Sequence, residues 1–174
     1  TVRLVKGAYW DSEIKRAQEL GLARYPVFTR KAHTDISYLA CARRLLDAGP
    51  HIYPQFATHN AHTAAAIVHM ASDRRDLEFQ RLHGMSDGLH QRLAQSPGFA
   101  TRTYAPVGLH KGLLPYLVRR LLENGANASI VSQLLDPEAD LNALIADPIL
   151  AAAARGFSAH PALGAPCDLT LPDR

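Results

Sequence analysis

The chain has 174 residues, of which 47% are hydrophobic and 20% charged, and its net charge at pH 7 is +3. This composition is typical of a soluble globular protein, and the length suffices for one domain. Basic residues are interspersed with acidic ones, no apolar run reaches membrane-spanning length, and no cysteine or histidine spacing fits zinc, which argues against a nucleic-acid-binding domain, a membrane span or a zinc domain.

Strand-like segments recur four times, and each is followed by helical sequence. The strands are predicted at residues 2–9, 51–58, 77–82 and 101–107. The helices are predicted at residues 11–20, 37–46, 61–71, 88–94 and 113–127, with Asp11 or Ser12 as the cap of the first. This order predicts an α/β protein whose parallel strands are joined by crossover helices, in a closed barrel or an open sheet.

The pattern is weaker after residue 127. Residues 134–149 are expected to form one short helix, and the proline- and glycine-containing tail from residue 151 is typical of a linker. The chain opens on a strand-like run without an initiator methionine, so we expect it to be a piece of a longer protein.

Polar and aromatic residues follow the strands, where parallel α/β folds place their chemistry. Lys6 and Gly7 end the first strand, and His59 and Asn60 lie between the second strand and a helix N-terminus, a position suited to an anionic group. The basic triplet Thr29-Arg30-Lys31 suits a pyrophosphate. Solvated charge and helix capping are the alternatives for these residues.

One helical stripe combines two arginines with a phenol. Tyr116, Arg119, Arg120 and Glu123 are spaced i, i+3, i+4 and i+7, which places them on one helix face. With Tyr104 they could hold a small apolar ring that carries a carboxylate, because guanidinium groups pair with carboxylates through two hydrogen bonds. The alternative is a solvated face with an Arg119–Glu123 pair of little energetic value.

These motifs together resemble the proline dehydrogenase domain of the bifunctional flavoenzymes called proline utilization A. The resemblance runs to about residue 149 and is carried by RLVKGAYWDSEIKRAQ (3–18), YPVFTRKAHTDISYLACAR (25–43), IYPQFATHNAHT (52–63), EFQRLHGM (78–85), YAPVG (104–108) and LVRRLLENGAN (117–127).

The resemblance implies an α/β fold in which residues 1–149 form the C-terminal half of a distorted (β/α)8 barrel. Residues 150–174 would link it to an aldehyde dehydrogenase module that acts on pyrroline-5-carboxylate or glutamate semialdehyde. The implied activity is FAD-dependent oxidation of L-proline to 1-pyrroline-5-carboxylate, by hydride transfer to flavin N5, with a quinone at the membrane as electron acceptor. A cytoplasmic protein peripheral to the inner membrane is expected, with no metal and no nucleic-acid contact from this segment.

The resemblance also implies roles for individual residues. The implied cofactor contacts are Arg3, Val5, Lys6, Gly7, Ala8, Trp10, Phe28, Thr29, Arg30, Lys31, Thr58, His59, Asn60 and Gln80. The implied substrate pocket is formed by Leu82, Tyr104, Tyr116, Arg119 and Arg120, and the residues with catalytic roles are Tyr9, Glu123, Tyr104, Tyr116, Arg119 and Arg120.

The chain also departs from the family pattern. The upstream half of the barrel, with an active-site lysine and aspartate, is expected outside this sequence. Ser86 replaces a usual glycine, which would strain the backbone if φ there is positive, and His33 replaces a usual tyrosine. The alternative function is a half-barrel that acts as a non-catalytic binding or scaffold module, with its sheet edges exposed.

Overall fold

The computed structural model describes residues 1–7, 9–95, 98–125 and 146–169, with side chains in helix α5 described up to residue 120. The chain divides into two compact units. The first, Thr1–Lys6 with Tyr38–Ile145, is called the sheet unit, and the second, Gly7–Ser37 with Ala146–Arg174, the helical unit.

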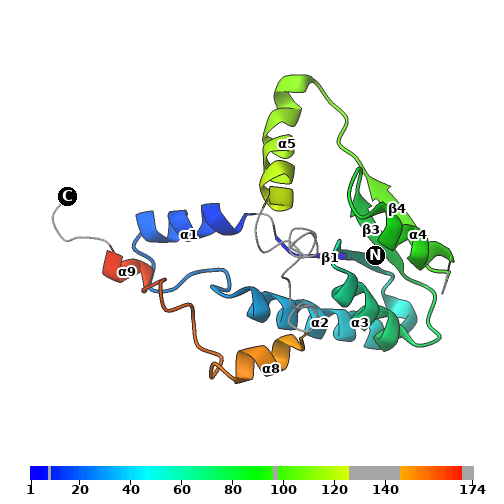
Figure 1. The fold of residues 1–174 in the computed structure, drawn as a ribbon, viewed down its shortest axis with the longest axis horizontal. Helices are drawn as coiled ribbons and strands as arrows, with labels where there is room; N and C mark the ends of the chain where they lie inside the picture. The colour runs from blue at the N-terminus through cyan, green and yellow to red at the C-terminus, as the bar shows by residue number, and fades with distance from the viewer. Residues whose placement is uncertain (8, 96–97, 126–145, 170–174) are drawn as a thin grey trace, which may run out of the picture. The chain divides into compact units, whose positions relative to one another are not determined.

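Four parallel strands form the sheet unit's centre (Figure 1). Strands β1 (Val2–Val5), β2 (Pro54–Ala57), β3 (Glu78–Leu82) and β4 (Ala100–Tyr104) lie side by side in chain order. Helices separate them along the chain, as the crossover connections between parallel strands require. The α/β prediction with parallel strands is therefore confirmed.

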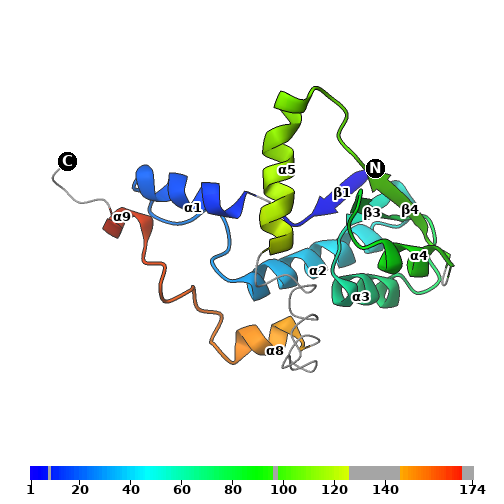
Figure 2. The same cartoon turned by 45° about the horizontal axis from the view of Figure 1, so that its top comes forward.

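Among the described residues, the helices of this unit are α2 (Lys31–Asp47, which begins in the helical unit), α3 (Ala61–Ala71), α4 (Asp87–Gln95) and α5 (His110–Gly125), with a 3-10 turn at Gly49–His51. Figure 2 shows α2 and α3 along the same side of the sheet. There they cover the side chains of Phe56 and Phe79, which are fully buried with Ile67 of α3. This apolar layer is the core, and its burial is the main term that stabilises the unit.

Side chains alternate across the strands, so the residues between the core positions point to the other face. The register aligns Arg3 with Gln55, Gln55 with Glu78, and Gln80 with Arg102. A polar row thus crosses the sheet opposite the apolar core.

The helical unit contains α1 (Trp10–Glu19), the first turns of α2, α8 (Pro148–Ala153) and α9 (Pro166–Leu169). Ile14 and Ala17 are the buried residues of α1. The backbone N–H of Cys167 donates to the Leu22 carbonyl at 3.0 Å, which ties α9 to the segment after α1.

Several predicted helix limits need correction. Tyr9 is the N-cap position of α1, so neither Asp11 nor Ser12 caps it. Helix α2 begins at Lys31 rather than at residue 37, and α5 begins at His110 with Pro115 inside it. Most of the helix predicted at 134–149 lies outside the described residues. Among those described, no helix is long and apolar enough to cross a membrane.

Candidate functional site

The inner surface of α5 carries the polar stripe. Tyr116, Arg119 and Arg120 are half-buried, whereas Leu114 and Leu117 on the same helix are 52% and 45% exposed. A surface helix normally buries its leucines and leaves its arginines in water. The reversed pattern here means that the described part of the stripe is not a solvated face.

Aromatic rings and guanidinium groups meet between α5 and the end of β4. The rings of Tyr104 and Tyr116 lie 6.5 Å apart at 57°. The guanidinium carbon of Arg120 lies 5.1 Å from the centre of the Tyr116 ring, and that of Arg3 lies 6.0 Å from the Tyr104 ring. Leu82 pairs with Tyr104 in the sheet register. The structure thus places Arg3, Leu82 and Tyr116 beside Tyr104, with Arg120 over the Tyr116 ring.

A buried carboxylate that the sequence analysis missed organises the polar row. Glu78 is 2% exposed and accepts hydrogen bonds from Gln55 (3.0 Å) and Gln80 (2.5 Å). Arg102 donates two more, from Nε to Oε1 and from Nη2 to Oε2, both at 2.8 Å. These hydrogen bonds, chiefly those of Arg102, hold the pKa of Glu78 below its usual value, while burial opposes them.

Gln80, predicted as a cofactor contact, therefore has its side-chain amide partly engaged by Glu78. The sequence signal for this network was the polar alternation Glu78-Phe79-Gln80 in β3 beside Arg102 of β4. The network could be identified only once the neighbouring strands and their register were known.

The loop after β2 prepares the N-terminus of α3. Asn60 Oδ1 accepts from the Thr63 N–H at 2.9 Å, and Thr58 Oγ1 accepts from the Asn60 N–H at 3.1 Å. Asn60 is the N-cap of α3, and its Nδ2 group has no hydrogen bond within the described part of the chain. The first N–H groups of α3 and this amide are donors suited to an anion.

His59 and Lys6 are held beside this loop. The Leu82 N–H donates to His59 Nε2 at 3.0 Å, so the proton of a neutral His59 ring lies on Nδ1. Lys6 Nζ lies 3.1 Å from Thr63 Oγ1 and 5.1 Å from the centre of the Tyr38 ring. The cation of Lys6 thus lies near the same helix N-terminus.

Two residues next to the loop after β2, Ser86 and His90, are conformationally or sterically constrained. Ser86 has φ of 53°, so the strain expected where serine replaces glycine is present in the backbone. His90 is 2% exposed and its Nε2 lies 3.1 Å from the Thr58 carbonyl. Burial is the main cause that lowers the pKa of His90, so the ring is neutral at pH 7.

The helical unit holds the other predicted cofactor contacts. The indole N–H of Trp10 donates to the Phe28 carbonyl at 2.8 Å, and Lys31 pairs with Asp35 at 2.7 Å. Arg30 Nε donates to the carbonyls of residues 158 and 159, at 2.9 and 3.3 Å. Thr29 Oγ1 accepts from the N–H of residue 160 at 2.9 Å.

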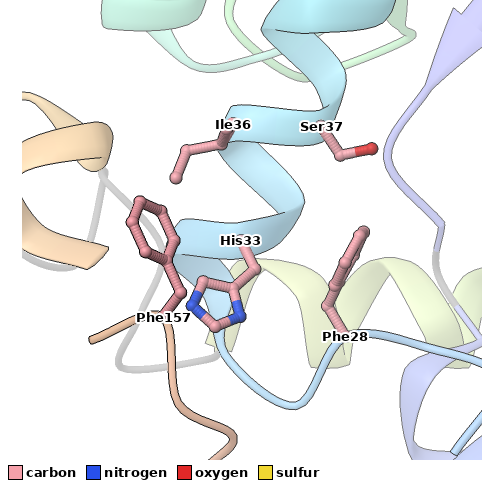
Figure 3. A pocket seen from close by; sticks show the side chains of 5 residues that line it. All are labelled: Phe28, His33, Ile36, Ser37 and Phe157. Carbon is pink, nitrogen blue, oxygen red and sulfur yellow. The ribbon is translucent and has the colours of Figure 1, made fainter. Parts of the chain in front are cut away.

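A pocket of about 300 Å³ opens beside this loop (Figure 3). It is lined by Phe28, His33, Ile36, Ser37 and Phe157. Figure 3 shows His33 between the two phenylalanine rings, whose centres lie 6.2 and 6.3 Å from that of His33. The pocket joins the loop before α2 with the segment after α8.

The remaining predicted residues are placed as follows. Val5 and Tyr9 are both 58% exposed, and a Cβ built on Gly7 would meet no atom within 4 Å. Ala8 lies outside the described residues, as does the side chain of Glu123. The roles assigned to the individual residues remain predictions.

Comparisons of sequence and of structure relate the chain to known proteins. Residues 1–133 match the sequence profile of a family described as proline dehydrogenase. The chain is 56% identical over 156 residues to the bifunctional protein PutA of Salmonella typhimurium, which covers 85% of the chain and 12% of that protein. It is 35% identical over 131 residues to mitochondrial proline dehydrogenase 2 of Arabidopsis thaliana, which covers 70% of the chain and 27% of that protein.

Solved structures resemble the chain along nearly its whole length. A crystal structure of a proline utilization A (PutA) variant from Bradyrhizobium japonicum matches with a TM-score of 0.91 and 57% identity, covering 98% of this chain and 18% of that one. PutA from Bdellovibrio bacteriovorus, inactivated by N-propargylglycine, matches with a TM-score of 0.80 and 37% identity, covering 99% and 17%. The chain thus spans less than a fifth of these relatives.

Proposed function

The chain belongs to the proline dehydrogenase family, and on this premise we propose that the protein that carries it oxidises L-proline to 1-pyrroline-5-carboxylate with FAD. The observation that carries the proposal is the inward-turned stripe of α5, where the Tyr116 ring lies beside that of Tyr104 and Arg120 lies over the Tyr116 ring. Residues 1–149 would form the C-terminal half of a distorted (β/α)8 barrel, and residues 150–174 would lead to an aldehyde dehydrogenase module.

The stripe suits the chemistry of proline. Arg119 and Arg120 offer planar forks of donors for the carboxylate, which a lysine could not match in geometry. Tyr104, Tyr116 and Leu82 offer apolar surface to the saturated ring, and such packing favours one orientation of the ring. Tyr9 and Glu123 are proposed to position these groups.

The donor set of the chain fits a flavin dinucleotide. The N-terminus of α3, Asn60 Nδ2 and Lys6 offer positive potential and N–H donors to phosphate oxygens, and Arg30 offers its two Nη groups in the helical unit. The chemistry that bound FAD supplies is two-electron oxidation at the proline carbon next to nitrogen, with a quinone at the membrane as the final acceptor.

The test uses the full-length protein with Arg119→Met or Arg120→Met. Loss of a hydrogen-bonded charge pair predicts a rise of about 10- to 100-fold in the KM for proline, with FAD content unchanged. Leu117→Met, exposed on the same helix, is the matched control and should leave the KM unchanged. An unaltered KM in both arginine variants would remove the stripe from the substrate site.

The flavin absorbance spectrum distinguishes the proposed enzyme from the alternative, a non-catalytic binding module. Addition of proline to the purified flavoprotein under anaerobic conditions should bleach the flavin absorbance. A protein that binds FAD but is not bleached by proline would support the alternative.

A further inference from the structure

The segment Phe157–His160, here called the strap, lies on the loop Phe28–Lys31. Its contacts with the loop are made by main-chain atoms of the strap. The carbonyls of Ser158 and Ala159 accept from Arg30 Nε, at 2.9 and 3.3 Å, and the N–H of His160 donates to Thr29 Oγ1 at 2.9 Å. The residues joined are 128 to 131 positions apart in the sequence.

These contacts orient the Arg30 guanidinium without using up its donors. Nε is engaged by the two carbonyls, and within the described part of the chain neither Nη group has a hydrogen bond. A guanidinium held at Nε has its two Nη groups fixed in direction, and this fork matches two oxygens of a phosphate. The Arg30 side chain is therefore already restricted in its rotamers before an anion binds, so binding costs less side-chain entropy.

The strap is itself anchored at its first residue, Phe157. At its start, the Phe157 N–H donates to the Ala152 carbonyl at 3.0 Å, and Phe157 has φ of 51°, a conformation that non-glycine residues rarely adopt. The Phe157 ring, 57% exposed, faces His33 of α2 across the pocket of Figure 3. Backbone strain of this kind persists only where the surrounding contacts impose it, and it is often found at functional sites.

We propose that the strap is a positioning device for the cofactor phosphates, and that Phe157 and His160 are positioning residues acting through Thr29 and Arg30. The proposal rests on the proposed function, since it takes these two loop residues as FAD contacts. It assigns part of the predicted linker (150–174) to the cofactor site, although none of the strap's residues would touch the reacting atoms.

The main test is His160→Pro in the full-length protein, because proline lacks the N–H that donates to Thr29. Loss of one hydrogen bond predicts a Kd for FAD about three- to tenfold higher. At saturating FAD, kcat and the KM for proline should return to the values of the unaltered protein. A variant that misfolds irreversibly would not be rescued by excess FAD.

A double-mutant cycle with Thr29→Val separates the strap from other effects. If the strap acts through the Thr29 hydroxyl, His160→Pro should change the FAD affinity much less in the Thr29→Val background. Phe157→Ala is the second variant, for use if His160→Pro fails to fold. Because this substitution removes no hydrogen bond of Thr29 or Arg30 directly, we expect a smaller effect, a Kd for FAD about two- to fivefold higher. Leu150→Ala, an exposed apolar truncation on α8, is the matched control and should have no effect.

The outcomes distinguish the two proposals. If the unaltered protein binds FAD and both strap variants bind it equally well, the strap has no positioning role and the proposed function stands. If FAD binding weakens but proline kinetics remain altered at saturating FAD, the effect is general damage and the strap proposal is overturned. If the unaltered protein binds no FAD, the proposed function fails and the strap proposal fails with it.

Discussion

The buried Glu78 carboxylate gives the sharpest stability prediction. Glu78→Gln keeps the size of the side chain and removes its charge, so the two donors of Arg102 lose their strongest acceptor. Hydrogen bonds to a charged group contribute about 1.5–3 kcal/mol each. Because the Arg102 side chain is 63% exposed, water can replace part of this interaction, and we expect a net loss of about 2 kcal/mol.

Urea unfolding of the full-length protein, read by pulse proteolysis, measures this loss. With a denaturant dependence of about 2 kcal/mol per molar urea, the midpoint of the domain should fall by roughly 1 M. In an Arg102→Met background the same substitution should cost clearly less, because its principal partner is already gone. Equal urea midpoints for Glu78→Gln and the unaltered protein would refute a stabilising role for the network.

The pH dependence of the free energy of unfolding is a second test of the role of Glu78. The pKa of Glu78 in the folded protein lies below its ordinary value of 4.5, chiefly because of the hydrogen bonds from Arg102. Its contribution to stability is therefore complete above pH 4.5 and is lost as the pH falls through the folded pKa. Glu78→Gln should remove this part of the acid destabilisation, which a urea series at decreasing pH can detect.

Three further predictions concern the N-cap of α3, the turn before α4 and His90 of α4. Ser86→Gly should raise the free energy of unfolding by about 0.5–1 kcal/mol, because glycine accepts the φ of 53° more readily, less the weak bond from Ser86 Oγ to the His59 carbonyl. The pKa of His90 is lowered from 6.5 by burial, so stability should fall as the pH drops below 6.5, where the unfolded chain takes up the proton first; His90→Gln should flatten that dependence in urea midpoints. Asn60→Asp keeps the capping oxygen and should leave the urea midpoint nearly unchanged. Loss of the Nδ2 donor and the added negative charge should weaken FAD binding at least tenfold, on the order of the contribution of one charge-assisted hydrogen bond. Equal FAD affinity would remove Asn60 from the cofactor site.

The sequence alone was enough where the signal was local. Strand β3 and helix α3 were located within a residue of their observed limits, since apolar alternation and capping residues act over a few positions. The stripe of Tyr116, Arg119 and Arg120 likewise follows from helical periodicity alone. Local patterns also predicted the parallel α/β arrangement, because each strand is followed by helical sequence.

Tertiary structure decided what each face meets. Periodicity shows that Tyr116 and Arg120 share a face with each other, but only packing against Tyr104 turns that face inward and leaves Leu117 exposed. Strand neighbours and register were needed to bring Arg102 to Glu78. Such contacts depend on which segments approach one another, and the sequence pattern of a single segment does not contain that information.

The early start of α2 and the strap have the same physical origin. The first turns of α2 gain their packing from His33 against Phe28 and Phe157, and Phe157 lies more than a hundred residues further along the chain. Local propensity therefore placed the start of this helix too late, and the tail was interpreted as a linker because its prolines and glycines are typical of one. What the sequence determined was the local repertoire of strands, helices and charged stripes, whereas long-range packing decided which of them face a common site.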